Sequence, residues 1–332
     1  MLRLGIIGCG RVTTMFHLGA IKRSGVVELV GVSDKGEEQL REVATAAHIP
    51  YAYADYSELL ACSEVEAIAI NTPPRLHEEM TLAALAAGKH VLCEKPLAQK
   101  VEGCLGIKNA KGNLVVLPAH NYAYTPALYR IEERIAEGAI GEVTSASLSF
   151  QNNLSMYGSK TDFRTTDPRG IVEDVLPHIF SVASKVAGPP AKVESVYGSC
   201  SKYEVCDNLT ARVVTDRGIP VNCTASWTKT IPEFGVTITG ERGTITSNFA
   251  MNPYGYALEA DGKKTKVSGR GVSWYLDLVR FRHPSFSEQY RHLERLVREG
   301  GEPRVSIDEE VAMLRVMGEI GKTAEEVSGN HG

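Results

Sequence analysis

A chain of 332 residues, 43% hydrophobic and 23% charged, has a globular composition and the length of about two domains. That composition argues against a disordered or fibrous protein. Its 36 basic and 40 acidic residues give a formal charge of −4, so no general electrostatic attraction draws the chain to nucleic acid or anionic lipid. We expect a small-molecule partner, with no nucleic acid and no membrane involved.

The seven cysteines include no C-x-x-C pair, and an odd number cannot all be bridged within one chain. This usage is typical of a reducing compartment and indicates no zinc site. The opening sequence MLRLGIIGCG lacks the apolar stretch of a signal peptide, and no run approaches the length of about 18 apolar residues that spans a membrane. We therefore expect a cytoplasmic protein.

The first 120 residues alternate short apolar runs with helix-like segments, as βαβ units around a parallel sheet do. The expected strands are Leu2–Ile7, Val26–Val32, Ala67–Asn71, His90–Cys93 and Leu114–Pro118, and the clearest helices are Glu37–Ala47 and His77–Ala87. Residues 1–120 are thus predicted to form a doubly wound α/β domain.

From about Glu142 the pattern changes to β-rich segments separated by turn residues, which is typical of an antiparallel sheet. The expected strands are Val143–Gln151, Lys192–Ser199, Leu209–Val214, Ile219–Ala225, Gly235–Thr239 and Thr244–Ser247, with one amphipathic helix over Gly170–Val186. We expect residues 121–283 to form an α+β domain with a mostly antiparallel open sheet that binds substrate.

Residues 284–332 return to helical periodicity over Pro284–Arg298 and Asp308–Val327, and these helices can pack back onto the first domain. Asp308 is expected to be an N-cap, with Glu309 and Glu310 favourable to the helix dipole. The predicted helices can cover only one face of the antiparallel sheet. We therefore expect a homodimer or homotetramer through the C-terminal sheet.

The sequence Gly8-Cys9-Gly10-Arg11-Val12-Thr13 follows the first predicted strand and precedes a helix, the context of a Rossmann dinucleotide fingerprint. Gly8 permits a tight turn, and Gly10 lets the backbone approach a pyrophosphate at the helix N-terminus. Thr13 stands where the third small residue is usual, a departure expected to displace the helix slightly. The alternative is an ordinary strand-to-helix turn.

Asp34 ends the next predicted strand, 24 positions beyond Gly10. A carboxylate there would accept hydrogen bonds from the adenosine ribose and repel a 2′-phosphate, which favours NAD. Lys35 is adjacent and could soften this preference, so NADP stays possible as a cofactor. The alternative role for Asp34 is to cap the following helix.

The chain resembles the glucose-fructose oxidoreductase/inositol dehydrogenase/MocA (Gfo/Idh/MocA) family of NAD(P)-dependent oxidoreductases. The resemblance rests on the Gly8–Thr13 turn, and on the sequences Asn71-Thr72-Pro73-Pro74-Arg75-Leu76-His77, Cys93-Glu94-Lys95-Pro96-Leu97 and Asp174-Val175-Leu176-Pro177-His178. It implies a Rossmann domain, a dehydrogenase acting on CH–OH groups, a homo-oligomer and a cis Lys95–Pro96 bond. Two departures touch the substrate side: Ala123 replaces a frequent arginine, and a usual glycine cluster shrinks to Gly170.

Three residues form the candidate catalytic set. Asp174 and His178 are four positions apart on the predicted helix, so both project from one face. An imidazole can remove an alcohol proton, and a carboxylate can orient it. Lys95 follows a predicted parallel strand, where its ammonium can bind the reacting oxygen. Alternatively, Lys95 is a surface lysine, Asp174 a helix carboxylate and His178 a buried histidine. Asp174 and His178 could also be half of a metal site, but the sequence shows no further ligands, so we expect no metal.

Further candidates come from the same motifs. Besides Gly8, Gly10, Asp34, Lys35 and Lys95, the cofactor set comprises Arg11, Val12, Asn71, Thr72, Pro73, His77, Glu94 and Asn121. The substrate set adds Tyr122 and Arg164 to Lys95, Asp174 and His178. His77 could equally be an ordinary helix-start residue, Asn121 and Tyr122 could be packing residues, and Arg164 could be a salt-bridge partner.

The sequence therefore predicts an NAD(P)-dependent oxidoreductase that transfers hydride between nicotinamide and a secondary alcohol or ketone of a sugar, sugar derivative or cyclitol. His178 would be the acid/base, and Lys95 would position the reacting oxygen. Two alternatives stay open. One is an NAD-dependent glycoside hydrolase that oxidises C3 transiently without net redox, and the other is a non-catalytic NAD-binding protein.

Overall fold

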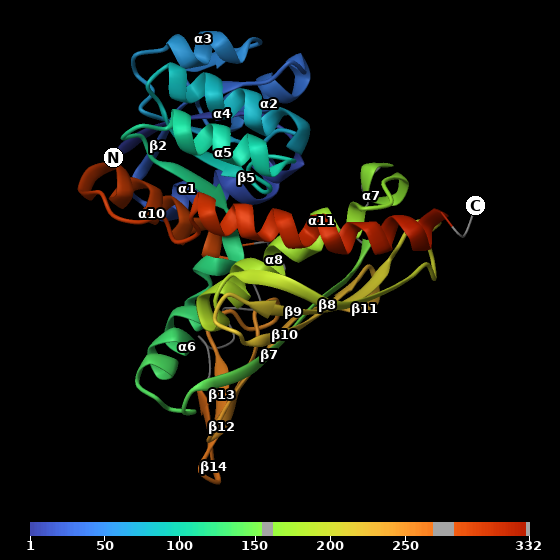
Figure 1. The fold of residues 1–332 in the computed structure, drawn as a ribbon. Coiled ribbons are helices and arrows are strands. Elements are labelled where there is room, and N and C mark those ends of the chain that lie inside the picture. The colour runs from blue at the N-terminus through green and yellow to red at the C-terminus, as the bar shows by residue number, and fades with distance from the viewer. Residues whose placement is uncertain (155–161, 268–281, 330–332) are drawn as a thin grey trace. The chain divides into compact units, whose positions relative to one another are not determined.

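A computed structural model describes residues 1–154, 162–267 and 282–329. The chain divides into two compact units, which Figure 1 colours by residue number. Unit 1 comprises Met1–Tyr124 and Asp277–Val311, and unit 2 comprises Thr125–Leu276 and Ala312–Gly332. Within the described ranges, no helix combines the length and apolar character needed to cross a membrane.

Unit 1 is built on a sheet of six parallel strands, so the predicted doubly wound sheet is confirmed. The strand order is β3-β2-β1-β4-β5-β6. Their bounds are β1 Leu2–Ile7, β2 Val27–Ser33, β3 Tyr51–Tyr53, β4 Ala67–Ile70, β5 His90–Glu94 and β6 Val116–Ala119. Connections leave β1 toward both edges, which creates a topological switch point between β1 and β4, where open α/β sheets bind ligands.

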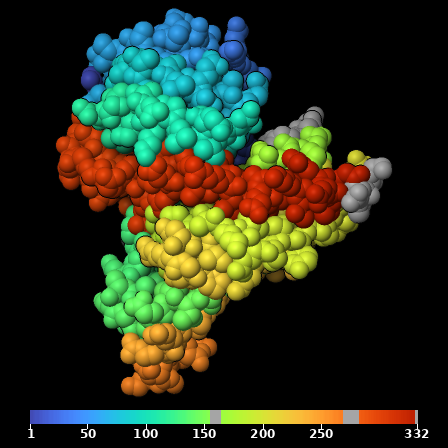
Figure 2. Space-filling model, in the orientation of Figure 1, coloured from blue at the N-terminus to red at the C-terminus, as the bar shows by residue number. Residues whose placement is uncertain are grey.

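Helices complete unit 1. They are α1 Leu18–Ser24, α2 Glu37–Ala46, α3 Tyr56–Ala61, α4 His77–Ala86, α5 Val101–Ala110 and, from far along the chain, α10 Pro284–Glu299. Residues around α3, α4 and α5 form much of the visible surface of this unit (Figure 2). Tyr290, Leu293 and Leu296 of α10 join Leu2 and Leu4 of β1 in one apolar core, so a helix distant in sequence is part of the first unit.

The start of helix α11 (Ile307–Gly329) corrects the expectation that Asp308 is its N-cap. The Ser306 hydroxyl accepts the Glu309 N–H at 3.1 Å, and the Glu309 carboxylate accepts the Ser306 N–H at 2.8 Å. This reciprocal pair is a capping box. The capping box is favoured over a cap by Asp308 because it satisfies two backbone donors at once. Asp308 therefore lies inside the first turn of the helix.

Glu66 ties three segments of unit 1 together at the start of β4. Its carboxylate accepts hydrogen bonds from Arg298 of α10 at 2.8 and 3.2 Å and from the Arg3 backbone of β1 at 3.0 Å. The Arg298 hydrogen bond, opposed by burial and helped by Arg3, lowers the pKa of Glu66 to about 2.

We expect Glu66→Gln to lower the free energy of unfolding by about 1 kcal/mol at pH 7, since both arginines are part-exposed and solvent screens the pair. Because the folded pKa is depressed, the contribution is complete above the unfolded pKa of about 4.5 and is lost as pH falls toward about 2. Denaturant unfolding between pH 7 and pH 2 checks this, with Glu42→Gln on an exposed position of α2 as control. If the difference in free energy of unfolding between wild type and Glu66→Gln were the same at pH 2 as at pH 7, the pKa of Glu66 would not contribute to stability as proposed.

Unit 2 contains an eight-stranded sheet in the order β14-β13-β12-β11-β7-β10-β9-β8. All pairs are antiparallel except β7 with β10, so the predicted mostly antiparallel sheet is confirmed. The strands are β7 Val143–Asn153, β8 Pro190–Ser199, β9 Asn208–Thr215, β10 Pro220–Ser226, β11 Thr228–Gly240, β12 Gly243–Asn248, β13 Tyr256–Ala260 and β14 Lys263–Val267.

The helices of unit 2 are α6 Pro126–Ala136, α7 Asp162–Thr166, α8 Gly170–Ala187 and most of α11. Helix α8 contacts β7, β9 and β10 (Figure 1). Most of this helix is buried, and the residues of α8 that are not buried are Glu173, Asp174, His178 and Lys185. The helix predicted over Gly170–Val186 is confirmed, and these four residues form one part-exposed stripe, called here the open stripe.

Candidate functional site

The candidate cofactor residues of unit 1 follow the carboxyl ends of its parallel strands. Gly8 comes after β1, Asp34 after β2, Asn71 after β4, Lys95 after β5 and Asn121 after β6. Carboxyl ends of parallel strands share one edge of a sheet. The topology therefore brings these five positions to the edge that contains the switch point.

The two glycines of the first turn are required for different reasons. Gly8 has φ +101°, and a Cβ there would lie 2.7 Å from the carbonyl oxygen of Asn71. Glycine is therefore needed at position 8 by the protein itself. Gly10 has no such backbone constraint, and a Cβ there would meet no atom of the described residues within 4 Å. Nothing in the fold around Gly10 demands glycine, which points to a ligand.

Thr13 is accommodated by a widened helical turn. Residues Thr13–His17 form a π-helical turn (η1), closed by the Leu18 N–H donating to the Thr13 carbonyl. The buried Thr13 hydroxyl donates to the Gly8 carbonyl at 2.6 Å and accepts from Asn71 Nδ2 at 2.9 Å. The hydroxyl of Thr13 therefore links the glycine turn to the end of β4, a role that glycine or alanine could not fill.

Asp34 connects the glycine turn to the end of β2. Its Oδ2 accepts the Cys9 N–H at 2.6 Å, and its Oδ1 accepts the Gly36 N–H at 2.7 Å. Gly36 is the N-cap residue of α2, and in the part of the chain that the structure describes this helix has no side-chain cap, so Asp34 bonds the backbone just before the helix and does not cap its first turn. The two bonds fix the carboxylate beside the turn.

These features fit a bound dinucleotide. The space over Gly10 is open, and the exposed side chains of Arg11, Val12, Lys35 and Pro73 surround the strand ends. The first N–H groups of a helix have no intrahelical acceptor and can receive a phosphate. In addition, the buried amide oxygen of Asn71 has no hydrogen-bond partner among the described residues. A polar ligand would satisfy it.

Lys95 stands on a turn whose backbone is held by His77, and the Lys95–Pro96 peptide is cis. His77 is buried; its Nδ1 lies 2.7 Å from the Pro96 carbonyl and its Nε2 lies 2.8 Å from the Thr72 carbonyl. Both ring nitrogens therefore face backbone acceptors and link the turns that follow β4 and β5. This arrangement supports a structural role for His77 beside the cofactor edge.

Glu94 belongs to a buried network that the sequence did not reveal. Its Oε1 lies 3.0 Å from Nε2 of His17, whose Nδ1 lies 2.6 Å from the hydroxyl of Tyr290. Burial raises the pKa of Glu94, but the His17 hydrogen bond and the positive charges of His17 and Lys95 outweigh it, so the pKa is lowered. The carboxylate is held charged beside Lys95. The sequence feature that could have pointed to this network is His17, a histidine on the buried side of the first helical segment.

Asn121 and Tyr122 lie in a short 3₁₀ helix (η3, Asn121–Tyr124) after β6. The Asn121 amide donates to the Ser285 hydroxyl at 3.3 Å, and the Tyr122 ring meets His283 edge-on with centroids 5.2 Å apart. Both contacts are with the start of α10 in the same unit. Ala123 is buried, and its carbonyl accepts a hydrogen bond from Nε of Arg304.

In unit 2, Asp174 and His178 lie on the open stripe of α8, and Arg164 of α7 reaches Asp174. Arg164 binds both oxygens of Asp174: Nη2 lies 3.0 Å from Oδ1, and Nε lies 3.0 Å from Oδ2. The ring of Phe150 stacks on the ring of His178, with centroids 5.2 Å apart and an interplanar angle of 21°. The salt bridge fixes Asp174, and the stack restricts the imidazole ring.

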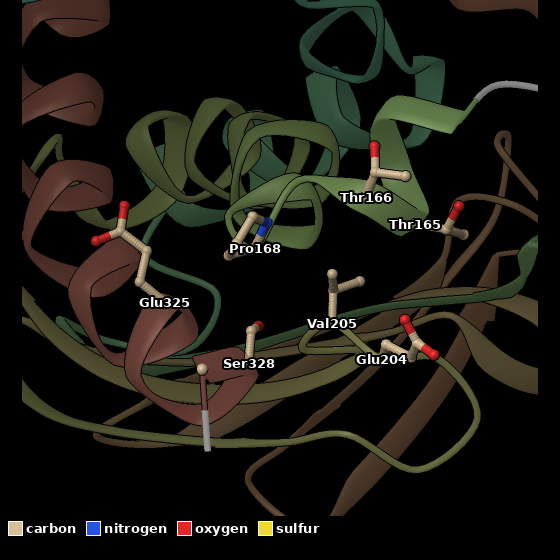
Figure 3. Close-up of a pocket in the computed structure, with 8 residues that line it drawn as sticks. Thr165, Thr166, Pro168, Glu204, Val205, Glu325 and Ser328 are labelled. Carbon is tan, nitrogen blue, oxygen red and sulfur yellow. The ribbon is translucent and has the colours of Figure 1, made fainter. Parts of the chain in front are cut away.

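A groove of about 520 Å³ lies elsewhere in unit 2 (Figure 3). Thr165, Thr166 and Pro168 line one side, and the other lining residues come from the β8–β9 loop and the C-terminal part of α11: Glu204, Val205, Glu325, Ser328 and Gly329. Asp174 and His178 are not among its lining residues. Its carboxylates and hydroxyls offer no acid/base pair like that of α8.

Comparison with known proteins agrees with this geometry. Residues 2–114 match the family model described as oxidoreductase family, NAD-binding Rossmann fold, and residues 129–246 match the GFO/IDH/MocA C-terminal domain. The chain belongs to the GFO/IDH/MocA family, and the predicted resemblance is confirmed. It is an NAD(P)-dependent oxidoreductase whose first unit is an NAD-binding Rossmann domain.

The individual relatives share between about a fifth and a third of their residues with this chain. A 1,5-anhydro-D-fructose reductase from Ensifer adhaerens is 29% identical over 258 residues, which cover 76% of this chain and 77% of that enzyme. An inositol 2-dehydrogenase from Pseudomonas savastanoi pv. phaseolicola is 34% identical over 174 residues, 50% of this chain and 51% of that enzyme. A solved levoglucosan dehydrogenase in complex with NADH is 19% identical, has a TM-score of 0.84, covers 98% and 97% of the two chains, and shows the shared fold.

The two glycines give a matched pair of variants. We expect Gly10→Ala to leave the unfolding midpoint unchanged and to weaken NAD binding at least about tenfold, because the methyl group enters the space that a pyrophosphate would occupy. Gly8→Ala should instead destabilise the fold by about 1–3 kcal/mol, because of its backbone angle. Calorimetric NAD titration and thermal unfolding of both variants check this. Wild-type affinity in a folded Gly10→Ala protein would refute the assignment.

Proposed function

We propose that this protein is a dehydrogenase for a secondary alcohol of a sugar, sugar derivative or cyclitol. The observation that carries the proposal is the pair Asp174 and His178 on the open stripe of an otherwise buried helix, in a chain whose Rossmann unit presents Lys95 at its ligand edge. The names of the reductase and the inositol dehydrogenase above support the substrate class.

The proposed cofactor contacts follow the strand ends of unit 1. The backbone at Gly8, Gly10, Arg11 and Val12 would hold the pyrophosphate, and Asp34 with Lys35 would meet the adenosine ribose. The other proposed cofactor residues are Asn71, Thr72, Pro73, His77, Glu94, Lys95 and Asn121. His77 would act through the backbone of Thr72 and Pro96, which its ring nitrogens face.

The proposed preference is for NAD, and it rests on the geometry of Asp34. Two backbone hydrogen bonds hold this carboxylate at the end of β2, so it cannot swing aside easily for a 2′-phosphate. Lys35 is exposed beside it and can partly offset the repulsion. NADP is therefore expected to bind more weakly than NAD.

The proposed chemistry assigns one task to each catalytic side chain. The residues at the strand ends of unit 1 would hold a nicotinamide dinucleotide, which would supply hydride-transfer chemistry at the substrate carbon. Lys95 donates a hydrogen bond to the reacting oxygen and stabilises negative charge there. His178 accepts the hydroxyl proton during oxidation and returns it during reduction. Asp174 favours the charged imidazole and binds substrate together with Tyr122, and Arg164 keeps the Asp174 carboxylate in place.

The proposal is tested by calorimetric titration with NAD and NADP, followed by an absorbance screen for reduced nicotinamide against sugars, cyclitols and nucleotide sugars. We expect tighter binding of NAD and NADH formation with one class of polyol. Cleavage of a glycoside without accumulation of NADH would instead establish the hydrolase alternative. NAD binding with neither reaction would favour a non-catalytic binder.

We also propose that the chain forms a homo-oligomer through the sheet of unit 2. On the face away from α8, the register aligns Asn222, Ser147, Thr237 and Thr246 across four neighbouring strands. Such small, uncharged polar side chains cost little to desolvate when two flat faces meet. Light scattering across micromolar concentrations tests this, and a monomer throughout would contradict it.

A further inference from the structure

A buried histidine–glutamate pair in unit 1 lies outside the roles assigned so far. His120, after β6, is fully buried, and Glu310, in the first turn of α11, is only 2% exposed. Nε2 of His120 lies 2.5 Å from Oε2 of Glu310. Burying a carboxylate is costly, so its presence in the core calls for compensating partners.

The second oxygen of Glu310 reaches the turn that carries Lys95. Oε1 accepts the N–H of Leu97 at 2.9 Å, two residues beyond Lys95. On the preceding residue, the carbonyl of Pro96 faces Nδ1 of His77 at 2.7 Å. Two buried side chains, from α4 and α11, therefore hold successive backbone groups of the Lys95 turn.

A neutral acceptor could satisfy the Leu97 N–H, so the charge at position 310 needs its own explanation. Burial raises the pKa of Glu310, but the charge and hydrogen bond of His120, the Leu97 N–H and the charge of Lys95 outweigh it, and the pKa is lowered. The carboxylate is thus ionised and within electrostatic reach of Lys95. Glu94 flanks the same lysine from β5.

We infer that Glu310, oriented by His120, is a positioning residue that fixes the Lys95 turn and stabilises the ammonium of Lys95. This inference rests on the proposed role of Lys95 in the reaction. Glu310 acts through the backbone of Leu97 and through charge, and His120 acts through Glu310. Neither residue needs to touch substrate or cofactor.

Two substitutions of Glu310 separate the two actions. Glu310→Gln keeps an oxygen for the Leu97 N–H but removes the charge, whereas Glu310→Met removes both. We expect hydrogen–deuterium exchange of a peptide containing Leu97 to rise at least about tenfold in Glu310→Met and little in Glu310→Gln. Glu319→Gln, at an exposed position of the same helix, is the matched control and should leave exchange unchanged.

Steady-state kinetics on the polyol found by the screen give the second readout. We expect Glu310→Gln to lower kcat by about 10- to 100-fold with KM for NAD within twofold, because the lysine loses a compensating charge while the turn keeps its hydrogen bond. His120→Gln should give a smaller loss of the same kind. The double variant should be no worse than Glu310→Gln alone, since both act on one carboxylate.

The outcomes separate this inference from the proposed function. If Lys95→Met abolishes turnover while Glu310→Gln and His120→Gln stay within twofold of wild type, the positioning role is overturned and the dehydrogenase proposal stands. If Lys95→Met keeps wild-type turnover, the proposed role of Lys95 and the positioning role of Glu310 are both overturned, although the measured turnover itself still establishes a dehydrogenase. If both Glu310 variants fail to fold, kcat of His120→Gln tests the positioning role instead, because this variant leaves Glu310 and its hydrogen bond to Leu97 in place.

Discussion

Replacement of His178 by alanine is expected to lower kcat by about 10²- to 10⁴-fold while NAD binding stays at the wild-type level. The imidazole is the group proposed to take the hydroxyl proton, and no other histidine lies on the open stripe of α8. Since the cofactor residues belong to unit 1, removal of a side chain in unit 2 should leave the dinucleotide affinity intact.

The measurement is kcat and KM on the polyol identified by the screen, with calorimetric NAD affinity and thermal unfolding on the same preparations. His178→Gln serves as a second variant, since it keeps a polar side chain of similar length that cannot cycle a proton. Turnover within a few-fold of wild type in both variants would remove His178 from the acid/base role.

Substitution of Lys95 by methionine should lower kcat by about 10²- to 10³-fold, the effect typical of losing one donor to a developing oxyanion. Methionine keeps much of the length and the apolar stem of lysine, so the Lys95 turn should retain its backbone bonds to His77 and Glu310. The loss can then be attributed to the ammonium.

The control for Lys95→Met is Lys100→Met, an identical change at an exposed position five residues further along the chain. It is expected to leave kcat and KM unchanged. A comparable loss in both variants would indicate a general effect of lost positive charge in this segment. A loss confined to KM in Lys95→Met would assign the lysine to binding alone.

Much of the fold could be predicted because it rests on local patterns. The buried parallel strands appear in the sequence as short apolar runs. The strands of unit 2 appear as segments in which polar and apolar residues alternate, separated by turn residues. Three strands were not predicted. β13 (Tyr256–Ala260) has only five residues, YALEA, of which alanine and glutamate have low strand propensity. β3 is only three residues long at a sheet edge, and β14, with the sequence KKTKV, has exposed side chains along most of its length and carries no apolar alternation.

The candidate site divides in the same way. The glycines and Asp34 were accessible because, in a dinucleotide fold, the turns after the first two strands have fixed places in the chain order. The pairs His17 with Glu94 and His120 with Glu310 are separated by 77 and 190 residues, so no local pattern could join them. Glu310 in particular stands in an acidic run that also suits a helix N-terminus.

The side-chain links around the glycine turn bear on how the cofactor would bind. The Asn71–Thr13–Gly8 chain and the Asp34–Cys9 bond join the ends of β1, β2 and β4 through contacts that the protein makes by itself. A turn that already has its final shape loses little conformational entropy when a ligand arrives. We therefore expect a preorganised binding site. Because the backbone needs little ordering, most of the free energy of the dinucleotide contacts would contribute to affinity and orientation.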